Sequence, residues 1–422
     1  MLRRPHRIAA RLLENLHIRI MALCLVLYLA GFVSGSVGCA ASPASQNAGA
    51  IASASSATTQ LVDDFRNTDL GATLKHSGSM ELQYARCYTL DIYEGGYVLV
   101  CMADGNRYLV VPEGAQPPAD LPKDVVVLNQ PAGNVYLAAS DTLCLFDALD
   151  ALDCISVSGI ERDDWYLPAM QSAMDEGKVV YGGKYRAPDY ELLLSRNVRL
   201  ALESTMINHA PDVREKLVEL GIPVLVEMSS YESEPLGRAE WIKLYGILCN
   251  KQDQAQKVFQ QQVDQVSAAS GQPTGKSMAY FYLNASGAAV VRKPGDYVTK
   301  MIEQAGGTYA FGSVDKATAG SSTTTMQMEQ FFAAAKDADV MVYNSSIDEG
   351  VRTMDDLLQK SQMLKECKAV RNGNVWVTDQ NMYQQMLNAG GIISDFRHVL
   401  EGSDESLVYL RRLLPLNKDQ EP

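Results

Sequence analysis

Aromatic and cationic side chains occur in loops that are predicted at the carboxyl ends of strands, where ligands of parallel α/β sheets gather. These loops are residues 160–166, 182–188, 203–211, 228–236, 284–296, 344–350 and 379–385. Aromatic rings provide contact area, whereas Arg and Lys neutralise negative charge. The cations stand out because the 422-residue chain is acidic, with a net charge of −13. For any single residue, local packing or solvation is the alternative. Together they predict a site for a flat or aromatic anionic ligand, built from Trp165, Tyr185, Arg186, Tyr231, Arg292, Lys293 and Tyr383.

Motifs that would indicate an enzyme are missing from the sequence. It contains no G-x-S-x-G, H-E-x-x-H or G-x-G-x-x-G pattern, which would supply a nucleophile, a metal site or a dinucleotide-binding loop. Residues 271–277 are similar to a phosphate-binding loop, but only three residues separate the glycines and Pro273 has no amide donor. We therefore expect no enzymatic activity and no cofactor.

A bare metal ion would need several His or carboxylate ligands that converge. Beyond residue 38 the histidines are His76, His209 and His398, in three different regions, so we expect no metal site. The cysteines beyond position 39 show no C-x-x-C pair. Buried free thiols are expected, with disulfides as the alternative, for Cys87, Cys101, Cys144, Cys154, Cys249 and Cys367.

The first 38 residues predict a signal peptide. Five arginines precede an apolar run at 21–33, which is shorter than the roughly 20 residues that a membrane-spanning helix needs. Small residues then lead to Cys39 in a pattern that resembles a lipoprotein cleavage site, with Ser36 in place of the usual Leu. We expect a lipid on Cys39 that anchors the protein to the membrane outside the cytoplasm. Ordinary secretory cleavage is the alternative.

Residues 39–60 are mostly Ala, Ser, Thr, Gly and Gln, a composition that predicts a flexible tether. Removal of residues 1–38, with five arginines and one glutamate, would change the net charge from −13 to −17. Such an acidic chain is a poor partner for nucleic acid, because phosphates require a basic surface. The remaining length is enough for two domains.

The rest of the sequence predicts an α/β protein with two Rossmann-like lobes. Residues 61–124 are rich in Tyr, Val and Leu and predict a β extension of lobe one, with a hairpin turn at Asp104-Gly105. Strands alternate with helices over 125–237, lobe one, and over 271–415, lobe two, which favours central, mostly parallel sheets. Residues 238–270 have helical spacing and predict a long bridging α-helical segment, broken near Asn250.

Each lobe has a glutamate in the first turn of a helix that leads into a buried strand. Glu191 precedes the strand at 200–202, and Glu329 precedes the strand at 340–343. A carboxylate there complements the helix dipole, which contributes about 0.3 to 1 kcal/mol and would explain either glutamate alone. The recurrence of the pattern in both lobes favours a shared role.

The chain resembles the substrate-binding proteins of ABC importers in the iron-siderophore, haem and cobalamin class, over roughly residues 75–400. Members of this class have two lobes bridged by one long rigid helix. Two features depart from the simplest members of the class. They are the turn Tyr185-Arg186-Ala187 at the tip of lobe one and the large β region before residue 112. The resemblance rests on the helix start at 189–191, on Gly-Ile-Pro-Val at 221–224, on residues 235–246, on Ala-Gly-Gly at 305–307 and on residues 368–376.

The resemblance implies that Glu191 and Glu329 dock into basic pockets of two permease subunits. Carboxylates on separate lobes can bind arginines of a partner at two separate positions. It also implies that a lipid-anchored monomer captures a ferric siderophore or a haem-like iron complex and delivers it to an ABC permease dimer with its ATPase subunits. Binding of cobalamin or another corrinoid, and a ligand-sensing role without transport, are the alternatives.

Overall fold

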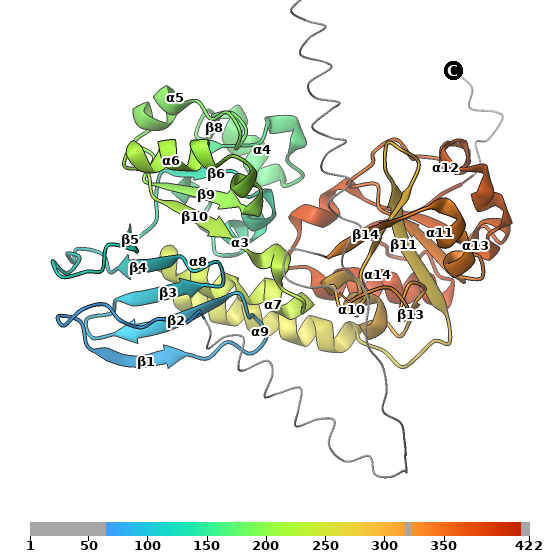
Figure 1. Ribbon diagram of the computed structural model, residues 1–422, viewed down its shortest axis with the longest axis horizontal. Coiled ribbons are helices and arrows are strands. Elements are labelled where there is room, and N and C mark those ends of the chain that lie inside the picture. The colour runs from blue at the N-terminus through green and yellow to red at the C-terminus, as the bar shows by residue number, and fades with distance from the viewer. Residues whose placement is uncertain (1–64, 317–321, 415–422) are drawn as a thin grey trace, which may run out of the picture. The chain divides into compact units, whose positions relative to one another are not determined.

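The structure is a computed structural model that describes residues 65–316 and 322–414. The signal peptide, Cys39 and the tether predicted for residues 1–60 lie outside the described residues. The described chain folds into three β-sheets with associated helices (Figure 1). None of the helices in these two ranges combines the length and the apolar character that a membrane span requires.

The N-terminal sheet has the strand order β1-β2-β3-β4-β5. The pairs β1–β2, β2–β3 and β3–β4 are antiparallel. Gly105 lies in the turn between β3 and β4 with φ at 86°, a conformation that glycine adopts without a steric cost. The hairpin predicted there is therefore confirmed. The strand bounds are β1 (His76–Met80), β2 (Tyr88–Tyr93), β3 (Val98–Met102), β4 (Arg107–Val111) and β5 (Val125–Asn129).

Strand β5 corrects the predicted border between the β extension and lobe one. It pairs in parallel with β4, from Arg107 opposite Val125 to Val111 opposite Asn129, and so belongs to the N-terminal sheet. Val125 and Val127 pack against a core cluster of that sheet. The sequence did not distinguish the two sheets, because a short run of valines fits the half-buried face of either one.

Lobe one contains a parallel sheet with the strand order β10-β9-β6-β7-β8. Its central strand β6 is not apparent from the sequence, because three residues are too few for a periodic pattern. Leu137, Leu202 and Leu225 share a core with Tyr88 and Val100 of the N-terminal sheet. The bounds are β6 (Val135–Leu137), β7 (Ile155–Ser158), β8 (Val180–Tyr181), β9 (Leu200–Ser204), β10 (Val224–Glu227), α3 (Leu143–Ala148), α4 (Pro168–Asp175), α5 (Tyr190–Ser195) and α6 (Pro211–Glu219).

Lobe two contains a mixed sheet with the order β14-β12-β11-β15-β16-β17, and β13 also pairs with β11. Strands β11, β15 and β16 are parallel, whereas β12, β14 and β17 are antiparallel to their neighbours. The bounds are β11 (Ser277–Leu283), β12 (Ala289–Arg292), β13 (Thr308–Tyr309), β14 (Thr323–Met326), β15 (Val340–Tyr343), β16 (Val375–Thr378), β17 (Leu410–Arg412), α10 (Tyr297–Gln304), α11 (Met328–Ala335), α12 (Met354–Lys360), α13 (Lys368–Arg371) and α14 (Ala389–Glu401).

The bridging segment consists of α7 (Pro235–Glu240), α8 (Ile242–Leu248) and α9 (Gln252–Ala269). The predicted break near Asn250 is confirmed, since this residue has φ at 57° between α8 and α9. Helix α9 contributes Ala255 and Phe259 to the core of lobe one and Val266 to the core of lobe two. Because one helix is packed into both cores, a large hinge motion between the lobes is disfavoured. The predicted α/β fold of two lobes with a helical bridge is therefore confirmed.

Candidate functional site

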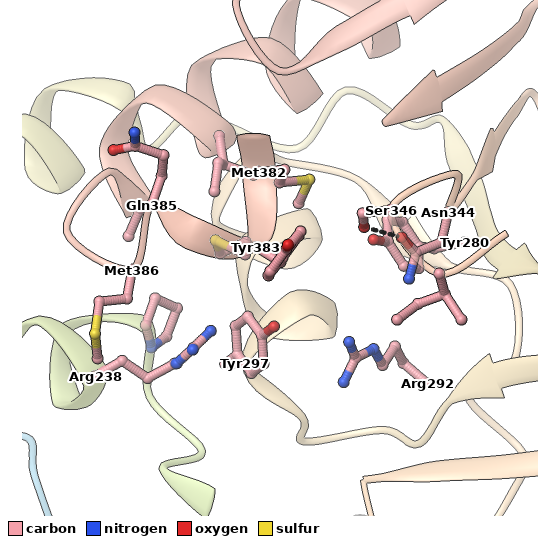
Figure 2. A pocket seen from close by; sticks show the side chains of 15 residues that line it. Arg238, Tyr280, Arg292, Tyr297, Asn344, Ser346, Met382, Tyr383, Gln385 and Met386 are labelled. Atoms are coloured by element: carbon pink, nitrogen blue, oxygen red, sulfur yellow. Dashed lines mark hydrogen bonds between the residues drawn. The ribbon is translucent and has the colours of Figure 1, made fainter. Parts of the chain in front are cut away.

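A pocket is lined by α7 together with strands, helices and loops of lobe two (Figure 2). The space between its lining residues measures about 530 Å³, a volume that includes open solvent. The lining residues are Pro235 and Arg238 of α7, Tyr280, Arg292, Tyr297, Met301, Asn344, Ser346, Ile347, Met382, Tyr383, Gln385, Met386, Ala389 and Ile392.

The topology of lobe two explains where this pocket forms. Strands β11, β15 and β16 run parallel, so their carboxyl ends meet at one edge of the sheet, where ligands of α/β proteins gather. Asn344 directly follows β15, and the 3₁₀ helix η7 (Gln380–Gln384) follows β16. The lobe-two loops predicted to face a ligand therefore do line the pocket. Of the loops predicted in lobe one, only 228–236 contributes a lining residue, Pro235.

The ring of Tyr297 lies between two arginine side chains. The guanidinium carbon is 4.3 Å from the ring centre for Arg238 and 5.4 Å for Arg292, and Figure 2 shows one arginine on each side of the ring. Such cation–π contacts attract the guanidinium group to the ring and limit its rotation. Asp296 fixes Tyr297 in place, because its carboxylate caps α10 by accepting a 2.9 Å hydrogen bond from the N–H of Val298. Two positive charges are thus positioned on the pocket wall.

Arg238 keeps its charge although its side chain is buried. Burial alone would lower its pKa, but Tyr297 and Asp141 outweigh burial and place the pKa above the usual value. Nη2 of Arg238 donates to Oδ2 of Asp141 at 3.3 Å, while its buried Nε–H has no hydrogen-bond partner in the structure. An anionic ligand would give this cation a charge-assisted partner.

Glu227 lies in the same buried region but does not cancel the charge of Arg238. Burial, and then the negative charge of Asp141, raise the pKa of Glu227 to about 8. At neutral pH the carboxyl group is therefore mostly protonated, even though it accepts a 2.6 Å hydrogen bond from the N–H of Ser229. The charges nearest the pocket wall are therefore two arginine–aspartate pairs, Arg238 with Asp141 at 3.3 Å and Arg292 with Asp296 at 3.5 Å.

The remaining wall combines one oriented amide with apolar side chains. The Asn344 side-chain oxygen accepts hydrogen bonds from the hydroxyls of Ser346, at 2.6 Å, and Thr378, at 3.3 Å. This pairing leaves the Asn344 NH₂ group as the donor on the pocket wall. Three methionines and Ile347 supply an adaptable apolar lining. The pocket can therefore bind a ligand with an apolar or aromatic body and negatively charged edges.

Gln384 connects the two lobes beside the pocket. Its Oε1 accepts a 3.0 Å hydrogen bond from the N–H of Tyr166, and its Nε2 donates a 2.8 Å bond to the carbonyl of Asp164. The rings of Tyr166 and Tyr383 also meet edge to face, with centres 6.4 Å apart. Gln384 is only 3% exposed, so these hydrogen bonds are protected from water. The contacts fix η7, and with it the rim of the pocket, against lobe one.

Two of the predicted ligand-binding residues, Arg292 and Tyr383, line the pocket. Trp165 does not, and the prediction for it is corrected here. Its side chain is completely buried in the core of lobe one, and its indole N–H donates a 3.0 Å hydrogen bond to the hydroxyl of Ser158. The loop composition around Trp165 gave no information on whether the ring points toward the core or the ligand.

The other predicted ligand-binding residues do not line the pocket. Arg186 stacks on its neighbour Tyr185, and its Nε donates a 2.6 Å hydrogen bond to the Tyr185 hydroxyl. Tyr231 is half-buried against the core of lobe one. Lys293 is half-buried, and its backbone N–H donates to the carbonyl of Ser322 at 2.8 Å. The structure therefore does not bring these four residues into the pocket.

Sequence reasoning missed Arg238, Tyr280 and Tyr297. Arg238 lies in the bridging segment, where a basic residue on a helix is ordinarily solvated, and Tyr280 lies within a buried strand. For Arg238 the available signal was its position in a helix whose other residues are all buried, which is unusual for a cation. For Tyr297 the available signal was the preceding Asp296, a residue type that favours helix N-caps. It would have placed Tyr297 in the first turn of a helix, directly after a loop predicted to face the ligand.

The two glutamates predicted to dock a partner are both exposed and lie in first helical turns. Glu191 is in α5, where Asp189 caps the helix by accepting a 3.0 Å hydrogen bond from the N–H of Leu192. Glu329 is in the first turn of α11. Among the residues that the structure describes, no group of three or more His, Cys, Asp or Glu side chains is arranged to hold a metal ion.

The fold and the pocket define a two-lobed solute-binding protein, and the sequence agrees. The chain belongs to the periplasmic binding protein family, whose sequence pattern matches residues 138–382. This range runs from the end of β6 in lobe one to η7 in lobe two. It excludes the N-terminal sheet, which is therefore an addition to the part that the family pattern describes.

Similar proteins include two uncharacterized lipoproteins of Methanocaldococcus jannaschii. One is 25% identical over 78% of this chain and 81% of its own length, and the other is 24% identical over 85% and 94%. Among solved structures, the periplasmic heme-binding protein HutB of Vibrio cholerae superposes with a TM-score of 0.51 at 19% identity, covering 62% of this chain and 98% of that protein. The heme-binding protein RhuT of Roseiflexus sp. RS-1 gives 0.50 at 17%, covering 64% and 98%. Similarity at this level supports the fold.

Proposed function

We propose that this protein is an extracytoplasmic solute-binding lipoprotein of an ABC importer and that it captures an iron complex, a ferric siderophore or a haem-like chelate. The observation that carries the proposal is the arrangement of Arg238 and Arg292 on either side of Tyr297. Chelates of this kind combine an aromatic or flat body with carboxylate or phenolate charges. The arginines would neutralise that charge, and the tyrosine and methionine side chains would contact the body.

Delivery to a permease would use the surface on which Glu191 and Glu329 lie. Both carboxylates are solvent-exposed, so arginines of a partner can reach them directly. The lipoprotein relatives support a lipid anchor at Cys39, which would keep the protein close to the permease. The rigid packing of α9 into both cores supports recognition of the two lobes as one unit.

Titration of the purified full chain would test the ligand. A catecholate ferric siderophore, a hydroxamate ferric siderophore, haem and cobalamin would each be added while heat release and visible absorbance are recorded. We expect saturable one-to-one binding of an iron complex. Arg292→Gln should weaken this binding by roughly 10- to 100-fold, because a buried charge-assisted hydrogen bond is worth about 1.5 to 3 kcal/mol.

Control variants separate the pocket from the rest of the surface. Arg371→Gln, on an exposed turn of α13, should bind like the wild type. Arg186→Gln tests the lobe-one tip, because equal loss in this variant and in Arg292→Gln would mean that the ligand spans both lobes. Saturable binding of cobalamin, without binding of any of the three iron complexes, would mean that the ligand is a corrinoid. The absence of binding to all four ligands would contradict the proposed ligand class and favour a sensory role.

A further inference from the structure

Two cysteines meet where the bridging segment contacts lobe one. Sγ of Cys154 lies 4.0 Å from Sγ of Cys249, although 95 positions separate them in the sequence. Cys154 ends the 3₁₀ helix η2 (Leu152–Cys154) just before β7, and Cys249 is the C-terminal cap of α8. Both thiols are free in this structure, and no second pair of cysteine sulfurs is in contact within residues 65–316 and 322–414.

Hydrogen bonds near the pair attach the bridging segment to lobe one without a covalent link. The N–H of Ala132 donates to the carbonyl of Leu248 at 2.7 Å, which attaches the end of α8 to lobe one. Gln254 attaches the start of α9, since its Nε2 donates to the carbonyl of Ala148 at 2.8 Å. Because a disulfide is about 2.05 Å long, the two sulfurs would need to approach each other by about 2 Å.

We propose that Cys154 and Cys249 form a disulfide outside the cytoplasm and that this bond fixes the start of the bridging helix α9 to lobe one. The inference rests on the proposed location of the protein but not on its ligand. Oxidising compartments favour such bonds. A link at this point would hold the αL turn at Asn250, which sets the direction in which α9 leaves lobe one.

The two thiols differ in a way that suits thiol–disulfide exchange. The contact with Cys249 lowers the pKa of Cys154 against the opposing effect of burial, whereas the pKa of Cys249 is raised by Cys154 and by burial. Cys154 is also half-buried, while Cys249 is only 4% exposed. Cys154 is therefore the attacking thiolate and Cys249 the resolving thiol.

The reaction needs a small disulfide as oxidant. The thiolate of Cys154 attacks one sulfur of the oxidant, forms a mixed disulfide and releases one thiolate. The Cys249 thiol then gives its proton to that thiolate and attacks Sγ of Cys154, releasing the second thiolate, which takes a proton from water. The protein is oxidised by two electrons, and the oxidant is reduced to two thiols.

Mass spectrometry and thermal unfolding of the full chain would test the link. One sample is isolated from cells with its thiols blocked, and another is purified, reduced and then incubated with oxidised glutathione. Each sample is digested without a reducing agent. We expect both digests to contain the Cys154 peptide joined to the Cys249 peptide. Closing a loop of this length should raise the melting temperature of the oxidised chain about 5 °C above that of the reduced chain.

Serine variants provide the controls. Cys154→Ser, at the less buried position, should lose both the linked peptide and the redox-dependent melting shift, and Cys249→Ser should do the same. Cys101→Ser and Cys144→Ser should keep both, because the sulfurs of Cys101 and Cys144 contact backbone carbonyls at 3.3 Å.

Three results would overturn the inference. One is alkylation of Cys154 and Cys249 in the glutathione-treated wild type, and another is an unchanged redox shift in Cys154→Ser. The third is a link that forms with glutathione but is missing from the chain isolated from cells. Ligand titration of the reduced chain tests the proposed function separately, so failure of one does not imply failure of the other.

Discussion

The backbone N–H of Tyr166 in lobe one donates a 3.0 Å hydrogen bond to Oε1 of Gln384 in lobe two. The Gln384 amide returns a second bond to the carbonyl of Asp164, so that one buried side chain satisfies two backbone groups of the opposite lobe. A neutral hydrogen bond contributes about 0.5 to 1.5 kcal/mol. The pair therefore links the rim of the pocket to lobe one by a contact of modest strength.

Replacement of Gln384 by alanine should loosen this contact. We expect the free energy of unfolding to fall by about 1 to 3 kcal/mol and the amide of Tyr166 to exchange its hydrogen at least about tenfold faster. Hydrogen exchange with peptide mass analysis measures the second effect. Gln362→Ala is the matched control, because the Gln362 amide bonds only to Leu358 of the preceding helix. Unchanged exchange at Tyr166 would show that the contact does not restrain the lobes.

Tyr297 should contribute to ligand affinity by positioning both pocket arginines. Tyr297→Leu removes the ring that Arg238 and Arg292 contact at 4.3 and 5.4 Å. We expect the dissociation constant for the ferric chelate or haem that saturates the wild type to rise roughly 5- to 30-fold, corresponding to about 1 to 2 kcal/mol. Tyr297→Phe keeps the ring and should stay within about threefold of the wild type. Equal loss in both variants would assign the effect to the hydroxyl instead.

Glu203 should make the stability of the protein depend on pH. This side chain is completely buried at the end of β9, neither carboxyl oxygen has a hydrogen-bond partner, and burial raises its pKa to about 8. The unfolded chain releases this proton near pH 4.5, whereas the folded chain retains it until about pH 8. The stabilising contribution is therefore complete below pH 4.5 and is lost as the pH rises through 8, by about 3 kcal/mol between pH 4.5 and 7.

Denaturant unfolding of Glu203→Gln at several pH values would measure this effect. The stability of the variant relative to the wild type should increase by about 3 kcal/mol from pH 4.5 to 7, because glutamine does not titrate. Any constant cost of the buried amide cancels, since only the slope with pH is compared. Glu191→Gln, at an exposed position, should follow the wild type at every pH. Parallel curves for Glu203→Gln and the wild type would contradict a protonated Glu203.

Charge reversal at the proposed docking glutamates should separate transport from binding. Glu191→Lys and Glu329→Lys should each leave the ligand affinity within about twofold of the wild type, because both side chains are exposed and outside the pocket lining. Uptake of the radiolabelled ligand by cells should fall at least about tenfold, since a repulsive pair at an interface costs several kcal/mol. Glu219→Lys, on the exposed surface of α6, is the control. Normal uptake in both variants would contradict the docking role proposed for Glu191 and Glu329.

Much of the fold could be predicted because it depends on local patterns. Alternating apolar strands and helices indicated two α/β lobes, and helical spacing over residues 238–270 indicated the bridge with its break near Asn250. The loops after β15 and β16 were identified as ligand-facing because parallel strands place their carboxyl ends at one edge. The same reasoning identified the loop after β16 that carries Tyr383 and the segment after β11 that carries Arg292, and both residues line the pocket.

Other features depended on contacts between distant parts of the chain. Strand β5 fits either sheet by composition, and only its pairing with β4 assigned it to the N-terminal sheet. The direction of a loop side chain is set by the space around it, which is why Trp165 proved to be a core residue. Cys154 and Cys249 gave no motif, because 95 positions separate sulfurs that the fold places 4.0 Å apart.

The sequence by itself determined the α/β class, the two lobes, the helical bridge and the acidic surface, because periodicity and composition express local burial and charge. Tertiary structure alone decided the pocket. Arg238 comes from α7, Tyr297 from α10 and Tyr383 from η7, and their proximity follows from packing of α7 and α14 around the carboxyl edge of the lobe-two sheet. Asp141, 97 positions from its partner Arg238, completes the charge balance. Long-range packing and desolvation give these residues their roles, and neither is encoded in the local sequence pattern.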